Sequence, residues 1–207
     1  MEAQRPGSAG EHALQSRYGT TARALAFYDN QMLDHLNRAM QTFIGRMEMM
    51  WIGTADARGE CDVSFRAGPR GFVRVLDAGT LLWPEYRGNG VLASAGNLVE
   101  NPHVGLMFLD FFDSTVGLHV NGRARLVDNG ELQANPETAR WVADALAGRS
   151  GRQPERWVWV TVEEAYIHCA KHVPRLVKRP KIRAWGSDDE HAKGGDYFRV
   201  RAHRRSE

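Results

Sequence analysis

The sequence predicts a mainly β fold of the α+β class, an antiparallel barrel with a few peripheral helices. Two observations lead to this prediction. About seven apolar or alternating runs of strand length follow one another at short spacing, and single helical segments are inserted between them. Such spacing favours an antiparallel barrel over βαβ units. A length of 207 residues, with 43% hydrophobic and 25% charged side chains, is typical of one globular domain with extensions.

The N-terminal part is expected to contain one amphipathic helix. Residues 1–10 are polar and include glycine and proline, so we expect them to be frayed. From Thr21 to Phe43, apolar side chains recur at steps of three and four residues. This spacing predicts a single helix that ends near Gly45, with Thr20 or Thr21 as its N-cap.

The remaining elements follow from alternation and from turn residues. The predicted strands are residues 49–54, 61–66, 72–76, 80–83, 103–111, 116–127 and 156–168, and the predicted helices are residues 91–99 and 136–147. Short turns make hairpins of the first two strands and of the next two. Asn129-Gly130 is expected to form a turn, and Asn135 is expected to cap the second helix, with Pro136 at its first position. From Lys171 onward the periodicity is lost, which predicts an irregular tail.

The charged residues are unevenly distributed. The chain has 27 basic and 25 acidic side chains, a formal net charge of +2. Residues 171–207 contain eleven basic and five acidic side chains, a local charge of +6, which leaves −4 for the rest. Arginine supplies 23 of the 27 cations, which favours bidentate contacts to oxyanions. A solvated basic tail, an anionic ligand, a partner subunit and nucleic acid all remain compatible with this charge.

The sequence gives an expectation about cellular location. Cys61 and Cys169 lie far apart, the first residues contain no apolar signal region, and no run approaches the ~20 apolar residues of a membrane helix. We therefore expect a cytoplasmic protein with reduced thiols and no membrane partner.

A first candidate phosphate site lies where a predicted strand enters a glycine-containing loop, at Ser64-Phe65-Arg66-Ala67-Gly68. Ser64 and Arg66 are two residues apart, so their side chains share one face of the strand. A hydroxyl and a guanidinium beside exposed backbone N–H groups suit a phosphate. The alternative is an ordinary surface loop with one paired arginine.

A second candidate is the loop Tyr86-Arg87-Gly88-Asn89-Gly90, which leads into the predicted helix 91–99. The free N–H groups and the positive dipole at a helix start favour an anion. Ser94 and Asn97 are expected to share one face of this helix, and Trp83 to offer an aromatic wall for a planar ring. The alternative is a glycine-rich turn before a capped helix.

Metal binding and acid–base catalysis are weakly indicated. His168-Cys169-Ala170-Lys171-His172 lacks the paired spacing of a structural zinc site, so we expect no metal. Asp110 and Asp113 are expected to flank a hairpin turn. Glu163 and Glu164 are expected to point to opposite faces of a strand.

Several of these segments resemble the pyridoxamine 5′-phosphate oxidase-like split-barrel family. The resemblance covers about residues 43–171. It is carried by Asp62–Gly68, Gly88-Asn89-Gly90, Gly96–Leu106, Val120–Ala124 and Tyr166–Lys171. It implies an antiparallel split β-barrel over residues 43–170. Residues 1–42 then form an N-terminal arm and helix, and residues 171–207 a basic tail packed on a partner subunit.

The same resemblance implies a homodimer that binds FMN at the subunit interface. Members of the family hold FMN in two such clefts, so Arg66 and the strand end Ser64–Gly68 are expected to bind its phosphate. The residues implied for the cofactor are Ser64, Arg66, Ala67, Gly68, Trp83, Tyr86, Asn89, Gly90, Ser94, Asn97, Lys171 and Arg175. Trp83 and Tyr86 would lie near the flavin, and Lys171 would come from the partner subunit. Lys171 or Arg175 would stabilise the reduced flavin.

The resemblance also has limits. True pyridoxamine phosphate oxidases carry a basic residue in place of Ser94 and a Trp- and Arg-bearing substrate segment near the C-terminus, where this chain has residues 181–186. It therefore implies FMN binding more than pyridoxamine phosphate oxidation. No catalytic side chain is assigned, because the flavin itself accepts the hydride.

Three functions remain in contention at this stage. The first is an FMN-dependent oxidoreductase that passes electrons between a reduced nicotinamide or small organic substrate and the flavin. The second is a split barrel that binds or senses flavin (FMN or FAD), deazaflavin or haem without turnover. The third is nucleic-acid binding by the basic tail, which we do not expect because no recognition fold accompanies it.

Overall fold

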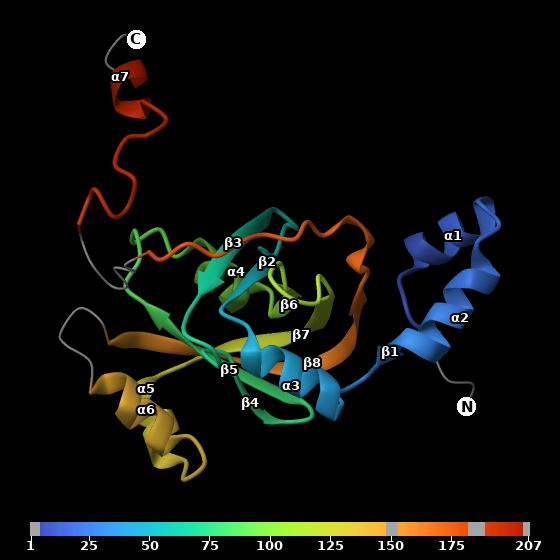
Figure 1. Ribbon diagram of the computed structural model, residues 1–207, viewed down its shortest axis with the longest axis horizontal. Helices are drawn as coiled ribbons and strands as arrows, with labels where there is room; N and C mark the ends of the chain where they lie inside the picture. Colours follow the sequence, from blue (N-terminus) through green and yellow to red (C-terminus); the bar gives the residue numbers. More distant parts are fainter. Residues whose placement is uncertain (1–4, 148–152, 182–188, 205–207) are drawn as a thin grey trace.

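An eight-stranded antiparallel sheet forms the body of the protein (Figure 1). A computed structural model describes residues 5–147, 153–181 and 189–204. The strands are β1 (Met32–Leu33), β2 (Met49–Ala55), β3 (Cys61–Ala67), β4 (Arg74–Asp77), β5 (Thr80–Tyr86), β6 (His103–Leu109), β7 (Gly117–Val127) and β8 (Pro154–His168). The helices are α1 (Ala9–Arg17), α2 (Thr21–Gln31), α3 (Arg38–Arg46), α4 (Ala93–Glu100), α5 (Asn129–Ala134), α6 (Ala139–Leu146) and α7 (Val200–Arg204), and Ala170–His172 form a 3₁₀ turn.

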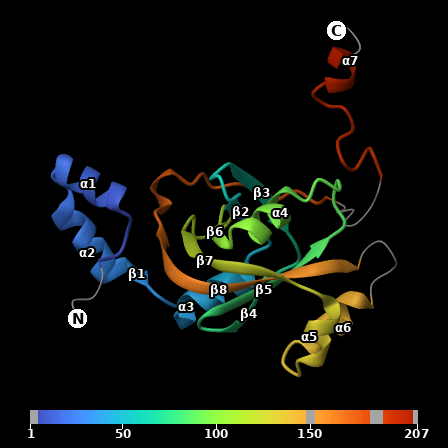
Figure 2. The same cartoon turned by 180° about the vertical axis from the view of Figure 1, so that it is seen from behind.

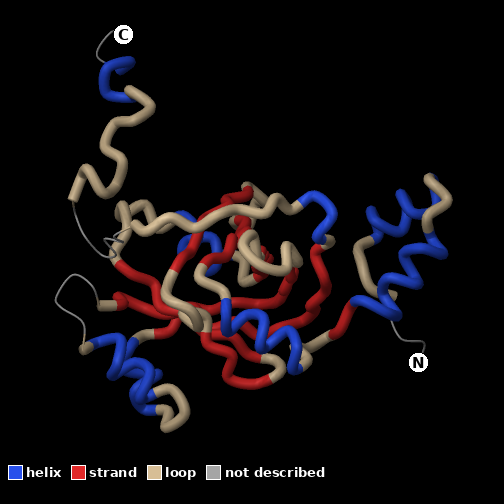
Figure 3. Tube along the Cα trace, viewed as in Figure 1, coloured by secondary structure: helices blue, strands red, loops and turns tan. Residues whose placement is uncertain are grey.

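The strand order is β3-β2-β6-β7-β8-β5-β4, and β1 pairs with β8. The two end strands, β3 and β4, do not pair with each other, so the curved sheet stays open at one side as a split barrel. The predicted class, mainly β with few peripheral helices, is confirmed (Figure 3). Both predicted hairpins, β2–β3 and β4–β5, are also confirmed.

The core lies inside the curve of the sheet. Along β2 and β6, buried side chains alternate with more exposed ones, as expected of strands with one face toward a core. Helix α4 packs against β2, β3 and β7, and its Leu98 joins the buried cluster. A second, smaller cluster lies under α5 and α6 and includes Leu132 and Trp157. The packing of α4 fixes the position of its N-terminus, which matters for the site below.

The single N-terminal helix predicted from Thr21 to Gly45 is wrong. The chain forms α2, then two residues of β1, and then α3. Met32 and Leu33 pair with Tyr166 and Ala165 of β8. Asn37 starts a new helix, because its side chain accepts a hydrogen bond from the N–H of Met40. The apolar residues keep a helical spacing across Met32 and Leu33, although these two residues form a strand. The pairing with β8 is determined by the tertiary fold and is not visible in the spacing.

Helix α1 begins at Ala9, within the segment that was expected to be frayed. Ser8 caps α1 in a capping box, in which Ser8 and Glu11 each accept from the other's backbone N–H. Residues 1–4 lie outside the described residues. Helices α1 and α2 form a pair beside the barrel, seen also from behind in Figure 2. Phe27 of α2 contacts Tyr166 of β8 edge to face.

The segment after β7 also differs from the prediction. Asn129-Gly130, expected as a turn, opens the short helix α5. The next helix begins at Ala139 rather than at Pro136, with Thr138 as its N-cap residue. Asn135 instead accepts a hydrogen bond from the N–H of Glu137 and so holds the turn between the two helices. The second helix therefore begins three residues later than the sequence pattern indicates.

Glu163 and Glu164 do not point to opposite faces. The pairing of β7 with β8 shifts here, since Asn121 pairs with Glu164 but Gly122 pairs with Val162. Glu163 is the extra residue of a β-bulge between buried Val162 and Ala165. Both glutamates line one groove, together with Glu11 and Asp62, which we call the outer groove.

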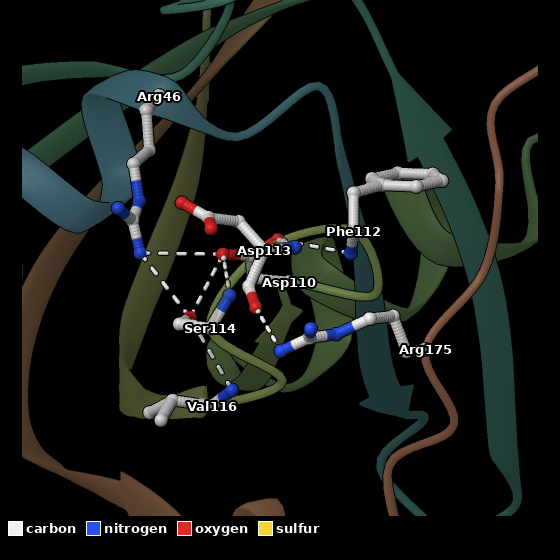
Figure 4. A network of polar contacts seen from close by, with 7 residues as sticks. All are labelled: Arg46, Asp110, Phe112, Asp113, Ser114, Val116 and Arg175. Atoms are coloured by element: carbon white, nitrogen blue, oxygen red, sulfur yellow. Dashed lines mark hydrogen bonds and ion pairs between the residues drawn. The ribbon is translucent and has the colours of Figure 1, made fainter.

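The turn between β6 and β7 holds the start of the C-terminal tail (Figure 4). Asp110 accepts hydrogen bonds from the backbone N–H groups of Phe112, Asp113 and Ser114, which confirms a turn-forming role. Arg175 in turn donates to the carbonyl oxygen of Asp113 at 2.8 Å. The predicted irregular tail is confirmed through residue 181, whereas α7 was not predicted. Residues 182–188, which include most of the segment 181–186, lie outside the described residues.

Candidate functional site

A cavity of about 750 Å³ lies at the open side of the barrel. It is bounded by β3, the end of β5, the loop that follows, and the first turn of α4. Seven of the twelve residues predicted to bind the cofactor line it: Ser64, Arg66, Ala67, Tyr86, Asn89, Gly90 and Ser94. The two predicted loops, which lie about twenty residues apart in sequence, therefore meet at one cavity.

Strand β3 turns one polar face toward this cavity. Asp62, Ser64 and Arg66 alternate with the more exposed Val63 and Phe65, as the two-residue period of a strand requires. The prediction that Ser64 and Arg66 share a face is confirmed.

Two hydroxyl groups and one carboxylate form a triangle on the cavity wall. Ser64 and Ser94 each donate to Oδ2 of Asp62, at 2.9 and 3.0 Å, and their own oxygens lie 2.8 Å apart. Ser94 is 5% exposed, so this contact joins β3 to the buried side of α4. Each hydroxyl has a single O–H donor, and Asp62 accepts the hydrogen bond from both of them.

Arg66 is held by an acidic residue from the opposite wall. Its Nε donates to Oε1 of Glu85 at 2.6 Å, and the buried Trp83 donates its ring N–H to the same oxygen at 2.9 Å. The Arg66 and Glu85 side chains are 25% and 16% exposed, and both line the cavity. It connects β3 to β5 across the open side of the barrel.

The first turn of α4 opens onto the cavity. Leu92, the N-cap residue, has a left-handed backbone (φ 57°), and within the described residues no side chain caps the helix. Asn89 does not reach the helix, since its Oδ1 accepts from the N–H of Val91 at 3.0 Å. The amide groups of a first helical turn have no partners within the helix. Those of Ala93–Ala95 therefore lie at the cavity wall as potential anion donors.

Tyr86 supplies part of the opposite wall. Burial raises the pKa of its phenol, while the charge of Arg74 acts in the other direction. The phenol therefore stays protonated at neutral pH and can donate a hydrogen bond.

The other five predicted residues lie outside the cavity. Gly68 is buried and donates its N–H to the carbonyl of Glu48, so this amide is already used. Trp83 is fully buried in the core, so it offers no wall to a ring and instead orients Glu85. Asn97 donates to Oγ1 of Thr54 at 3.0 Å.

Lys171 and Arg175 lie in the tail. Lys171 is exposed in the 3₁₀ turn after β8, and Arg175 is bound to the β6–β7 turn of its own chain. The role proposed for both involves a second subunit, and it stays a prediction.

Sequence reasoning missed the two carboxylates of the site. Asp62 lies two residues before Ser64 on a strand, so the same alternation that selected Ser64 and Arg66 indicates it as well. Glu85 has no comparable signal. Its contact with Arg66 depends on how β5 faces β3 across the barrel.

A larger groove elsewhere on the surface suits an anionic ligand less well. The outer groove, of about 980 Å³, is lined by Glu11, Asp62, Glu163 and Glu164, and no Lys or Arg is among its described lining residues. His119 and His168 lie 3.0 Å apart on the outer face of β7 and β8. No group of three or more potential metal ligands occurs within residues 5–147, 153–181 and 189–204. Over the same residues, no helix combines the length and apolar character needed to cross a bilayer.

Fold and cavity together define a split-barrel protein with a polar cavity at its open side. The chain belongs to the pyridoxamine 5′-phosphate oxidase family, whose sequence model matches residues 36–169. This confirms the resemblance found from the motifs. No curated protein matches the chain.

Three solved structures illustrate the similarity. HupZ from Group A Streptococcus is 18% identical, with a TM-score of 0.47, over 69% of this chain and 99% of that one. An FMN-binding protein from Syntrophomonas wolfei is 12% identical, with a TM-score of 0.45, over 83% and 100%. HutZ, the haem storage protein from Vibrio cholerae, is 16% identical, with a TM-score of 0.38, over 64% and 93%.

Proposed function

We propose that this protein binds FMN in the cavity at the open side of the barrel and uses it as an oxidoreductase. One observation carries the proposal. The first turn of α4, the Arg66 guanidinium and the Ser64 and Ser94 hydroxyls, from separate parts of the chain, meet at a single cavity. Backbone N–H groups, a guanidinium and hydroxyls are the donors that proteins use for phosphate.

The residues present fit the remainder of FMN as well. A volume of about 750 Å³ lies within the roughly 300–1,000 Å³ typical of cofactor sites. Phe65, Phe72, Pro84 and Tyr86 add apolar surface suited to a planar ring. Arg66 and the backbone amides of the first turn of α4 would hold the phosphate, and Asn89 and Tyr86 would contact the polar parts of the ligand.

Bound FMN would supply hydride and electron transfer, while the chain's own residues bind and orient it. The carboxylates Asp62 and Glu85 are both committed to hydrogen bonds within the cavity wall. This arrangement supports a site whose side chains position ligands rather than move protons. A reduced nicotinamide or a small organic molecule is the proposed electron donor.

A homodimer forms part of the proposal. Val63 and Phe65, on the outward face of β3, are 70% and 53% exposed, and Phe65 packs edge to face on Trp51 of β2. This exposed apolar surface lies directly beside the cavity, because Phe65 also lines it. A second copy placed here would cover both the apolar surface and the cavity mouth.

Haem is less well supported at this cavity. Among its described lining residues there is no His, Cys or Met, and Tyr86 is the only side chain of a type that ligates haem iron. Burial raises the pKa of Tyr86, which disfavours the tyrosinate that binds iron. Deazaflavin and FAD share the flavin ring shape and remain alternatives to FMN.

The test is a titration of the purified protein with FMN, in which quenching of the flavin fluorescence measures binding. Wild type should bind, and Arg66→Ala should bind about 10- to 100-fold more weakly, since a charged hydrogen-bond donor to phosphate is lost. Arg58→Ala is the matched control, because Arg58 is 75% exposed on the β2–β3 turn and pairs only locally. Equal affinity of wild type and Arg66→Ala, or no binding by wild type, would overturn the proposal.

A further inference from the structure

The side chains suited to a phosphate are already bound to carboxylates of the same chain. Arg66 is paired with Glu85 at 2.6 Å, and Ser64 and Ser94 donate to Asp62. Each of these three side chains therefore already has an acidic partner in the cavity wall. A ligand phosphate that approaches the Nε–H of Arg66 therefore competes with Glu85 for this donor, while the Nη groups of Arg66 can still bind the phosphate.

The charges at the cavity are balanced. Its lining contains two carboxylates, on Asp62 and Glu85, and two guanidinium groups, on Arg66 and Arg156. Arg156 is also paired outside this network, with Glu155 at 3.0 Å. A phosphate monoester thus enters a wall without excess positive charge and meets Glu85 directly at Arg66.

We propose that Glu85 is an internal competitor of the ligand phosphate and sets the anion selectivity of the cavity. The inference rests on the proposed function, because it assigns Glu85 a role toward the phosphate of FMN. A dianionic phosphate displaces Glu85 from Arg66, because it attracts the guanidinium more strongly than a single carboxylate does. A singly charged anion gains little by the same exchange, so Glu85 excludes it.

The surroundings of Glu85 suit this exchange. The buried Trp83 N–H donates to the same carboxylate oxygen at 2.9 Å, so Glu85 keeps one hydrogen bond when Arg66 turns away. Arg66 has a second contact, from its Nη1 to the carbonyl of Phe65 at 3.3 Å, which keeps it at the cavity wall. The exchange therefore leaves no buried polar group without a partner.

The test compares FMN with riboflavin, which has the same ring and side chain but no phosphate. In Glu85→Gln, the FMN affinity should rise about tenfold, because a neutral amide holds Arg66 less strongly than a carboxylate. The riboflavin affinity should stay unchanged, which also shows that the cavity is intact. Glu60→Gln is the matched control, since Glu60 is 71% exposed and pairs with Arg58 away from the cavity.

A second variant and a second ligand keep the test decisive. Glu85→Asp retains the charge but withdraws the carboxylate from Arg66, so FMN should again bind more tightly than to wild type. Inorganic phosphate, added without FMN, should bind more tightly to both variants than to wild type. Weaker or unchanged FMN binding in both, with riboflavin unaffected, would show that Glu85 only positions Arg66 and would overturn the inference. If wild type binds neither flavin, the proposed function fails, and the role of Glu85 fails with it.

Discussion

Replacing Asp110 by Asn removes the carboxylate that organises the β6–β7 turn. Asp110 is 7% exposed at its side chain. It accepts from three backbone N–H groups at 3.0–3.1 Å, from the Ser114 hydroxyl at 2.8 Å and from Arg46 at 3.3 Å (Figure 4). An asparagine offers one acceptor oxygen and places an NH₂ group against these donors. The turn should therefore lose stability.

The magnitude follows from the pKa of Asp110. Burial by itself raises this pKa, but the hydrogen bonds from Ser114, Asp113 and Phe112 together outweigh it and lower the pKa from 3.8 to about 2. A lowered pKa in the folded state stabilises the protein above pH 3.8, and this stability is lost as the pH falls toward 2. At pH 7 the difference corresponds to about 2 kcal/mol, and roughly half of it remains at pH 3.

Urea unfolding followed by tryptophan fluorescence measures this effect. Asp110→Asn should lower the free energy of unfolding by about 2 kcal/mol at pH 7 and by about half as much at pH 3. Asp113→Asn is the matched control, because Asp113 lies in the same turn with an exposed side chain. A mutant as stable as wild type at pH 7, or a deficit that does not shrink at pH 3, would refute the reasoning.

Two further substitutions probe the sheet itself. Gly122→Ala should destabilise the protein by about 2 kcal/mol, because a Cβ there would lie 2.1 Å from the carbonyl oxygen of Thr161. Gly88→Ala, with no atom within 4 Å of its Cβ, should leave the melting temperature unchanged, and equal melting of both variants would contradict this. Burial and the neighbouring His168 lower the pKa of His119, so wild type should lose stability as the pH falls below 6.5. His119→Gln should lose less than wild type between pH 7.5 and 5.5 in urea unfolding, and an identical loss would show that His119 does not contribute.

Strands could be predicted from the sequence better than helices. The alternation in β2 and β7 indicates one buried face directly, and the hairpins follow from local turn residues. The break between α2 and α3 could not be predicted, because it depends on long-range contacts. Leu36 is fully buried, and its N–H donates to the carbonyl of Ala78 in the β4–β5 turn.

The same distinction between local and long-range determinants applies to the candidate site. Ser64 and Arg66 follow from the two-residue period of one strand, and the open start of α4 follows from a local glycine-containing loop. The contact of Glu85 with Arg66 and the burial of Trp83 do not follow from local sequence. Both depend on β5 facing β3 across the barrel, although the strand order places β3 at one end of the sheet and β5 next to the other end. The β-bulge at Glu163 is likewise a property of the pairing with β7.

The most direct test of the central claim is the ratio of the riboflavin to the FMN dissociation constant, measured for wild type, Arg66→Ala and Arg58→Ala. This ratio isolates the contribution of the phosphate. We expect a large ratio in wild type, an unchanged ratio in Arg58→Ala and a ratio at least about tenfold smaller in Arg66→Ala. A wild-type protein that binds both flavins equally, or an Arg66→Ala variant that keeps the full ratio, would contradict the assignment of the cavity as a flavin phosphate site.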